Sequence, residues 1–232
     1  MPVKYKFLLF DADGTLLDFK KSEDEAVREA LAMNGFVADD ADVALYSEIN
    51  DGLWKKLERG EIEKKVLLYK RFELFYEAVG KDLDAKKTAA DYMQTLSTKG
   101  YLLDGAQKMC RTLYGKAQMY IVTNGVEFIQ RGRYARCGID KYFNGVFISD
   151  AIGIEKPSVK YFDYVAEHVD GFCKENTLII GDSLTSDMLG GINYGIDTCW
   201  YNPAGKSAPD TMSLTCVAKN FDEVVDFILS EE

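Results

Sequence analysis

The chain has 232 residues, and 47% of them are hydrophobic, enough to bury the core of one large domain or of a domain with an insertion. Its 38 acidic residues outnumber its 28 basic ones and give a formal net charge of −10, which argues against binding along the phosphates of a nucleic acid. The first apolar run is too short for a signal peptide, and no later one could span a bilayer. We therefore expect a cytoplasmic protein that has no contact with a membrane.

The cysteines favour a reduced protein without a zinc site. They are odd in number, show no Cys-x-x-Cys spacing and mostly lie among apolar residues. The five are Cys110, Cys137, Cys173, Cys199 and Cys216.

A short apolar run near the amino terminus predicts a strand over residues 5–10, because Phe7-Leu8-Leu9-Phe10 suits a strand buried on both faces. It is followed by Asp11-Ala12-Asp13-Gly14-Thr15. This segment has two interpretations: a turn, which Asp and Gly favour, or a site at the strand end where ligands of α/β sheets bind. If the two carboxylates lie close together, their repulsion requires a cation or a shared proton.

The next block has helical periodicity and no β-branched run, so we expect four antiparallel helices between Ser22 and Lys99. Ser22 and Glu25 match a capping box at the start of the first helix, and Asn34-Gly35 ends it. The other three helices are predicted near residues 43–57, 61–79 and 84–96. We expect their apolar stripes to form the core of a small bundle that acts as a lid.

From Gly105 onward, helices and strands alternate, which indicates βαβ units and a parallel sheet. Pro157 suits the first turn of one of these helices. The strand at residues 5–10 finds its partners only after the helical block. The predicted architecture is therefore α/β: a core of residues 1–16 and 100–232, with an all-helical four-helix cap of residues 17–99 inserted into it. Strands are expected at 118–122, 146–149, 177–180, 198–201 and 215–217, and helices at 105–113, 126–137, 157–169, 186–194 and 221–229.

Polar residues follow several of these strands, and the carboxyl ends of parallel strands meet at one edge of the sheet. We therefore expect these distant residues to share one crevice. They are Asp11, Asp13, Thr123, Asn124, Lys156, Asp182 and Asp187.

Taken together and in this order, the segments resemble the four motifs of the haloacid dehalogenase superfamily of phosphohydrolases. The matching segments are Asp11 to Thr15, Thr123-Asn124-Gly125, Lys156-Pro157 and Gly181 to Asp187. The helical insertion is similar to the cap of the first subclass. The resemblance covers the whole chain and implies a Rossmann-like parallel sheet.

The resemblance also implies how the site works. Asp11 is the expected nucleophile, which forms an aspartyl-phosphate. Asp13 is the expected general acid for the leaving oxygen and general base for the hydrolytic water. Mg²⁺ is the expected cofactor, held by Asp11, Asp182 and the backbone carbonyl of Asp13, while Asp187 orients the waters of the ion.

The same resemblance assigns the phosphoryl oxygens to three donors. They are the Thr123 hydroxyl, the Asn124 backbone amide and the Lys156 ammonium group, each placed to stabilise developing negative charge.

The substrate expectation comes from a subgroup. Segments at residues 16–19, 50–60, 190–193 and 198–202 look like the pyrimidine 5′-nucleotidases, so we expect a nucleoside monophosphate as the small-molecule partner. The alternatives are a phosphatase of another small ester, such as a sugar phosphate or phosphoglycolate, or a non-catalytic binding protein. A 2-haloacid dehalogenase is less favoured, because those relatives lack an acid at the position of Asp13.

Overall fold

The computed structural model describes residues 4–230, and the chain divides into two compact units. The first unit contains the segment that ends at Asp18, the segment Leu102–Glu127 and the segment that begins at Cys137. The second unit contains Phe19–Tyr101 and Phe128–Arg136. Residues 128–136, which the sequence analysis placed in the α/β core, thus group with the helical unit.

The first unit is built on a parallel sheet. Within residues 4–230 the sheet has six strands in the order β3-β2-β1-β4-β5-β6, and every neighbouring pair is parallel. This confirms the predicted Rossmann-like α/β fold. The strands are β1 (Phe7–Phe10), β2 (Gln118–Thr123), β3 (Gly145–Ile148), β4 (Thr177–Gly181), β5 (Asp197–Tyr201) and β6 (Cys216–Ala218).

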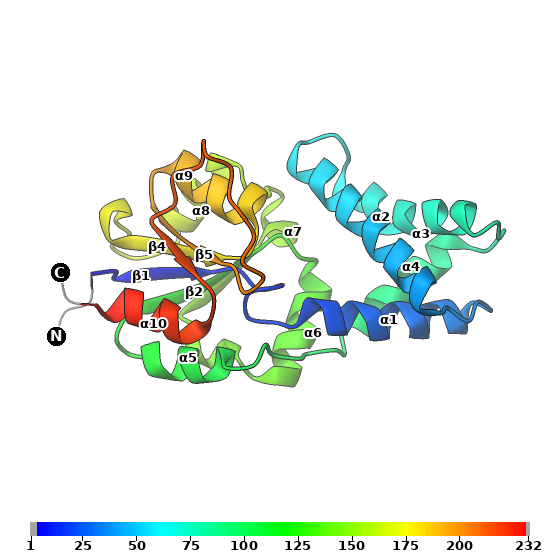
Figure 1. Cartoon of the computed structure of the whole chain (residues 1–232), viewed down its shortest axis with the longest axis horizontal. Helices are drawn as coiled ribbons and strands as arrows, with labels where there is room; N and C mark the ends of the chain where they lie inside the picture. The colour runs from blue at the N-terminus through cyan, green and yellow to red at the C-terminus, as the bar shows by residue number, and fades with distance from the viewer. Residues whose placement is uncertain (1–3, 231–232) are drawn as a thin grey trace. The chain divides into compact units, whose positions relative to one another are not determined.

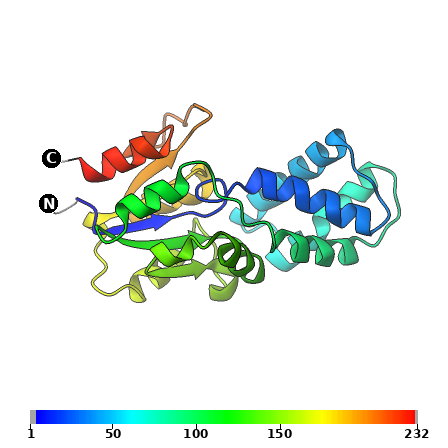
Figure 2. The same cartoon turned by 90° about the horizontal axis from the view of Figure 1, so that it is seen from below.

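Helices cover both faces of the sheet (Figure 1). On one face lie α8 (Val159–Glu167) and α9 (Leu189–Tyr194); on the other, α5 (Ala106–Leu113) and α10 (Phe221–Leu229) lie side by side, as Figure 2 shows from below. All four residues of β1 are fully buried, as expected for a central strand between two helical layers. The unit also contains the short elements α7 (Ser149–Ile152), η1 (Asp140–Tyr142), η2 (Lys174–Asn176) and η3 (Leu184–Met188).

The second unit is entirely helical. Its aromatic core consists of Tyr46, Phe72, Phe75 and Tyr92, whose rings contact one another at centroid distances of 5.0–6.3 Å. The helices are α1 (Phe19–Met33), α2 (Asp40–Glu58), α3 (Lys64–Ala78), α4 (Ala85–Leu96) and most of α6 (Glu127–Cys137).

A buried arginine explains why α6 groups with this unit. Arg133 has no exposed surface, and its guanidinium donates to the backbone oxygen of Lys99 (3.1 Å) and to the Ser22 hydroxyl (3.3 Å). A close backbone approach adds to this, because a Cβ at Gly132 would lie 2.5 Å from the backbone oxygen of Ser97. The helix is therefore tied to the first turn of α1 and to the segment that ends the bundle.

Two predicted helix starts are wrong. Helix α1 begins at Phe19, so Ser22 lies inside the helix, and its hydroxyl donates to the Lys99 backbone oxygen (3.0 Å) instead of capping. Helix α8 begins at Val159 with Ser158 as its N-cap, so Pro157 precedes the helix. In the first case the tertiary contact with Lys99 takes precedence over the local capping pattern.

No helix in the described part of the chain combines the length and apolar character needed to cross a membrane.

Candidate functional site

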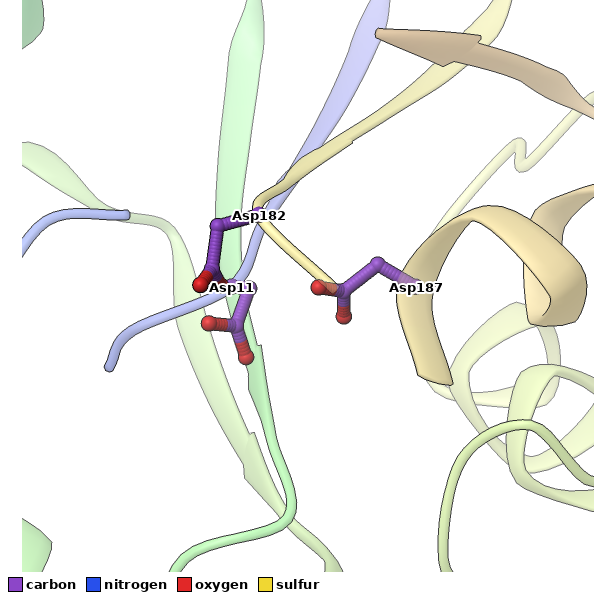
Figure 3. Close-up of side chains that lie close together, drawn as sticks. All are labelled: Asp11, Asp182 and Asp187. Carbon is purple, nitrogen blue, oxygen red and sulfur yellow. The ribbon is translucent and has the colours of Figure 1, made fainter. Parts of the chain in front are cut away.

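Three carboxylates meet at the carboxyl edge of the sheet (Figure 3). Asp11 follows β1, Asp182 follows β4, and Asp187 lies in η3. One carboxylate oxygen of each residue lies within 4.8 Å of those of the other two. The juxtaposition follows from the register: β1 and β4 are hydrogen-bonded neighbours with Phe10 opposite Ile180, so both chains leave the sheet at the same level.

Lys156 lies among these carboxylates and is fully buried. Its Nζ atom donates to Asp11 Oδ1 (2.8 Å), to Asp187 Oδ1 (2.6 Å) and to the backbone oxygen of Val122 (2.7 Å). These three bonds match the three protons of an ammonium group. With every group ionised, three carboxylates and one ammonium leave two negative charges in the cluster.

The electrostatics of the cluster favour a divalent cation. Burial raises the pKa of Asp11, with Lys156 opposing the rise. Asp182 is exposed as a residue, but loss of hydration at its carboxylate, together with the charge of Asp187, raises its pKa to about 7. Burial disfavours the charge on Lys156, but Asp11 and Asp187 outweigh it and raise the pKa of the lysine. A hard divalent cation such as Mg²⁺ prefers oxygen ligands, so the donor set and the excess negative charge both fit it.

The turn after Asp11 packs directly against Asp182. Gly14 has φ of +83°, and a Cβ there would lie 2.5 Å from Asp182 Oδ2, so both the backbone conformation and the close approach require glycine. Thr15 Oγ1 donates to Asp182 Oδ1 at 3.4 Å. Asp13 is half-buried, and its negative charge contributes to the raised pKa of Asp182. The segment is therefore a turn, and its first residue, Asp11, belongs to the carboxylate cluster.

The side chain of Asn124 holds the backbone of Lys156. Its Nδ2 donates to the Lys156 backbone oxygen (2.9 Å), and its Oδ1 accepts from the Lys156 backbone N–H (2.8 Å). Sequence reasoning had assigned a role only to the Asn124 backbone amide. The preceding Thr123 ends β2, is buried, and accepts a hydrogen bond at Oγ1 from the Gly125 N–H (3.0 Å).

Two serines that sequence reasoning missed organise the loop around Asp187. The Ser183 N–H donates to Asp187 Oδ2 (3.1 Å), and the Ser183 hydroxyl accepts from the Ser186 N–H (3.1 Å). Ser186 Oγ in turn accepts from Asn124 Nδ2 (3.3 Å). The sequence contains a signal for this contact, because Ser183 lies three residues before Ser186, the spacing at which an N-cap serine accepts from a backbone N–H. Both oxygens of Asp187 are thus engaged by protein donors.

Comparison with known proteins decides the family. The model of the haloacid dehalogenase-like hydrolases matches residues 5–195, most of the chain and all four polar segments. The chain belongs to the haloacid dehalogenase-like hydrolases. The resemblance read from the four motifs is therefore confirmed.

Individual members of this hydrolase family are similar over nearly the whole chain. The pyrimidine 5′-nucleotidase PynA of Streptococcus pneumoniae is 42% identical over 200 residues, which cover 86% of this chain and 84% of PynA. The pyrimidine 5′-nucleotidase YjjG of Escherichia coli is 31% identical over 222 residues, covering 96% and 97%. The crystal structure of the HAD-hydrolase YfnB of Bacillus subtilis, bound to magnesium, superposes with a TM-score of 0.92 at 35% identity and covers 97% and 98%.

The structure places six of the seven predicted site residues of this hydrolase in two groups, and Asp13 lies apart from both, between Asp11 and Gly14. Asp11, Lys156, Asp182 and Asp187 form the cluster itself. Asn124 is attached to it through the Lys156 backbone, while Thr123 stands beside Asn124 at the end of β2. The catalytic and binding roles of the individual residues remain predictions.

Proposed function

We propose that this hydrolase is a phosphatase that removes the phosphate group from pyrimidine nucleoside monophosphates. The observation that carries the reaction class is the cluster of Asp11, Asp182 and Asp187 around the buried Lys156, on a chain of the haloacid dehalogenase-like family. The substrate class is supported by the identity to PynA and YjjG, both named as pyrimidine 5′-nucleotidases.

Mg²⁺ is the proposed cofactor. Asp11, Asp182 and the backbone carbonyl of Asp13 are the groups we propose to hold it, because both oxygens of Asp187 already accept hydrogen bonds from Lys156 and Ser183. When bound, the ion neutralises negative charge on the phosphoryl oxygens and on the carboxylates facing them. The magnesium-bound structure of the similar YfnB supports this choice of metal.

The proposed nucleophile is the Asp11 carboxylate. It attacks phosphorus and forms an aspartyl-phosphate, while the alkoxide of the nucleoside leaves. The hydrogen bond from Lys156 Nζ fixes the orientation of this carboxylate before the attack. The Thr123 hydroxyl and the Asn124 backbone amide are two proposed donors to the phosphoryl oxygens. Lys156 is the third, and it would use the proton that it gives to Asp11 in this structure. The Asn124 side chain also holds the Lys156 backbone in place.

Asp13 is the proposed proton carrier. It lies two residues after the nucleophile, on the turn that Gly14 allows, and is half-buried where Asp11 is buried. As an acid it gives a proton to the leaving oxygen, and as a carboxylate it then takes one from the water that hydrolyses the aspartyl-phosphate.

Replacing the nucleophile tests the reaction class. With an aryl phosphate and Mg²⁺, Asp11→Asn is expected to lose nearly all activity, because a neutral amide cannot form the aspartyl-phosphate. Asp163→Asn, at an exposed position of α8, is the matched control and should keep wild-type activity. An active Asp11→Asn variant would overturn the proposal.

A substrate panel tests the substrate class separately. Pyrimidine and purine nucleoside monophosphates, sugar phosphates and phosphoglycolate are compared by kcat/KM for phosphate release. The proposal predicts the highest value for a pyrimidine nucleotide. A sugar phosphate or phosphoglycolate as the best substrate would contradict the nucleotidase assignment and leave the phosphatase assignment standing.

A further inference from the structure

Two cysteines lie opposite each other on the last two strands of the sheet, β5 and the edge strand β6. Cys199 of β5 and Cys216 of β6 are register partners in a parallel pair, so their side chains stand on the same face. Neighbouring strands run about 4.8 Å apart, which lies inside the Cα separation of about 4.4–6.8 Å that a disulfide bridges. Each thiol also contributes to the shift in the pKa of the other, so the two side chains lie near one another.

The two thiols differ in environment. Cys199 is fully buried, whereas Cys216 is half-buried and accessible to a small reagent. Interaction with the Cys199 thiol lowers the pKa of Cys216, and the same interaction together with burial raises the pKa of Cys199. Because the thiolate is the reactive form, Cys216 is the thiol expected to react first.

The local backbone can adapt to a covalent link. Strand β6 has three residues, and within residues 4–230 its only partner is β5. Residues 202–215, which connect the two strands, contain no helix or strand. This short edge strand therefore has fewer constraints on its position than the central strands have.

We propose that Cys199 and Cys216 form a reversible disulfide when the protein meets a peroxide. The Cys216 thiolate attacks one peroxide oxygen; the S–O bond forms, the O–O bond breaks, and the released hydroxide takes a proton to become water. Cys199 then attacks the sulfenic sulfur; the S–S bond forms, the S–O bond breaks, and the leaving hydroxide takes the Cys199 proton to become a second water. The two thiols are oxidised by two electrons and one hydrogen peroxide is reduced to two waters.

The link would attach the last strand to the sheet covalently. Strand β6 leads directly into α10, whose Phe221 stacks on Tyr201 of β5 at a centroid distance of 4.6 Å. The disulfide would therefore attach β6 and α10 to β5 by a covalent bond. In the reduced protein only hydrogen bonds and packing hold them there.

Mass spectrometry of the full-length protein tests the proposal. Reduced protein is treated with one equivalent of hydrogen peroxide, unfolded, alkylated and digested. We expect a mass loss of two hydrogen atoms, three of the five thiols alkylated, and a peptide pair joined through Cys199 and Cys216. Dithiothreitol should restore all five thiols. Retention of all five thiols, or a link between other cysteines, would overturn the proposal.

Two variants separate the roles of the pair. Cys199→Ser removes the second thiol, so Cys216 is expected to accumulate as a sulfenic acid that a dimedone probe labels. Cys173→Ser is the matched control, since Cys173 is also half-buried but donates to Glu175, and this variant should form the link as the wild type does. Absence of the label in Cys199→Ser, or loss of the link in Cys173→Ser, would contradict the assignment.

Discussion

Lys156 is the residue on which the charge balance of the site depends. It is buried together with Asp187, which is 1% exposed, and Asp11, which is 8% exposed. Two buried carboxylates share one ammonium group, so neither can stay ionised at low cost without it. The lysine therefore stabilises the fold as well as positioning the proposed nucleophile.

Lys156→Met is expected to destabilise the protein by about 3–5 kcal/mol at neutral pH, the usual cost of leaving buried charges without their partner. Burial already raises the pKa of Asp11, and without the ammonium group that pKa rises further, so the folded state binds a proton more readily than the unfolded state. The loss should therefore shrink as the pH falls. Urea unfolding at several pH values measures this. Lys160→Met, at an exposed position of α8, is the control, and an equal loss in both variants would contradict the account.

At the same scale, residue types and strand ends were enough to bring Asp11, Lys156, Asp182 and Asp187 together in prediction. The reason is topological, because all strands of a parallel sheet present their carboxyl ends at one edge. The role of the Asn124 side chain was not predictable, since it depends on where the loop before Lys156 passes. The pairing of Cys199 with Cys216 depends on strand register, which the sequence pattern does not determine.

Among the elements, α6 begins next to the candidate site and belongs mostly to the helical unit. It follows the Thr123-Asn124-Gly125 segment, yet residues 128–136 belong to the helical unit through Arg133. The periodicity of the sequence predicted this helix correctly, but it could not predict its unit. A single fully buried arginine bonded to Lys99 and Ser22 decides that.

Arg133→Met is expected to lower the free energy of unfolding by about 1–3 kcal/mol, because it removes buried hydrogen bonds to Lys99 and Ser22. Hydrogen exchange should rise in α6 more than in the strands of the sheet. Arg136→Met, exposed on the same helix, serves as the control. Unchanged stability of Arg133→Met would show that α6 is held by other contacts.

Local sequence patterns predicted some helix ends and missed others. Helix ends with a clear local signal were predicted closely, such as the end of α1 before Asn34-Gly35 and the start of α4 after Asp84. Two helix starts were predicted wrongly. At Ser22 a tertiary hydrogen bond to Lys99 replaces the capping bond. At Pro157 the loop that leads from Lys156 delays the start of the helix to Val159. Fold class survives such errors, since it depends on the order of elements and not on their ends.

For the molecule as a whole, negative charge is abundant, and three carboxylates gather at the edge of the sheet. The net charge of −10 disfavours polyanionic partners. At the cluster, the single positive charge of Lys156 faces three carboxylates, which leaves an excess of negative charge suited to a divalent cation. A phosphate ester must therefore be met by a few local donors together with the proposed Mg²⁺.

Magnesium is expected to stabilise the fold more as the pH rises through about 7, the pKa of Asp182. Folding raises the pKa of this carboxyl group from 3.8 to about 7. The metal-free folded state therefore becomes less stable as the pH rises between these two values. The ion competes with the proton for this carboxylate and offsets that loss. Thermal unfolding with and without MgCl₂ at several pH values checks this; a shift in Tm that is the same on both sides of pH 7 would contradict it.

The central claim is that Asp11 becomes phosphorylated during turnover, and trapping that species tests it most directly. Protein mixed with Mg²⁺ and a pyrimidine nucleoside monophosphate carrying labelled phosphate is quenched in acid, in which an acyl phosphate persists, and digested. We expect labelled phosphate bound to the peptide that contains Asp11, released by hydroxylamine and absent from Asp11→Asn. Release of inorganic phosphate at full rate with no label on that peptide at any quench time would contradict it.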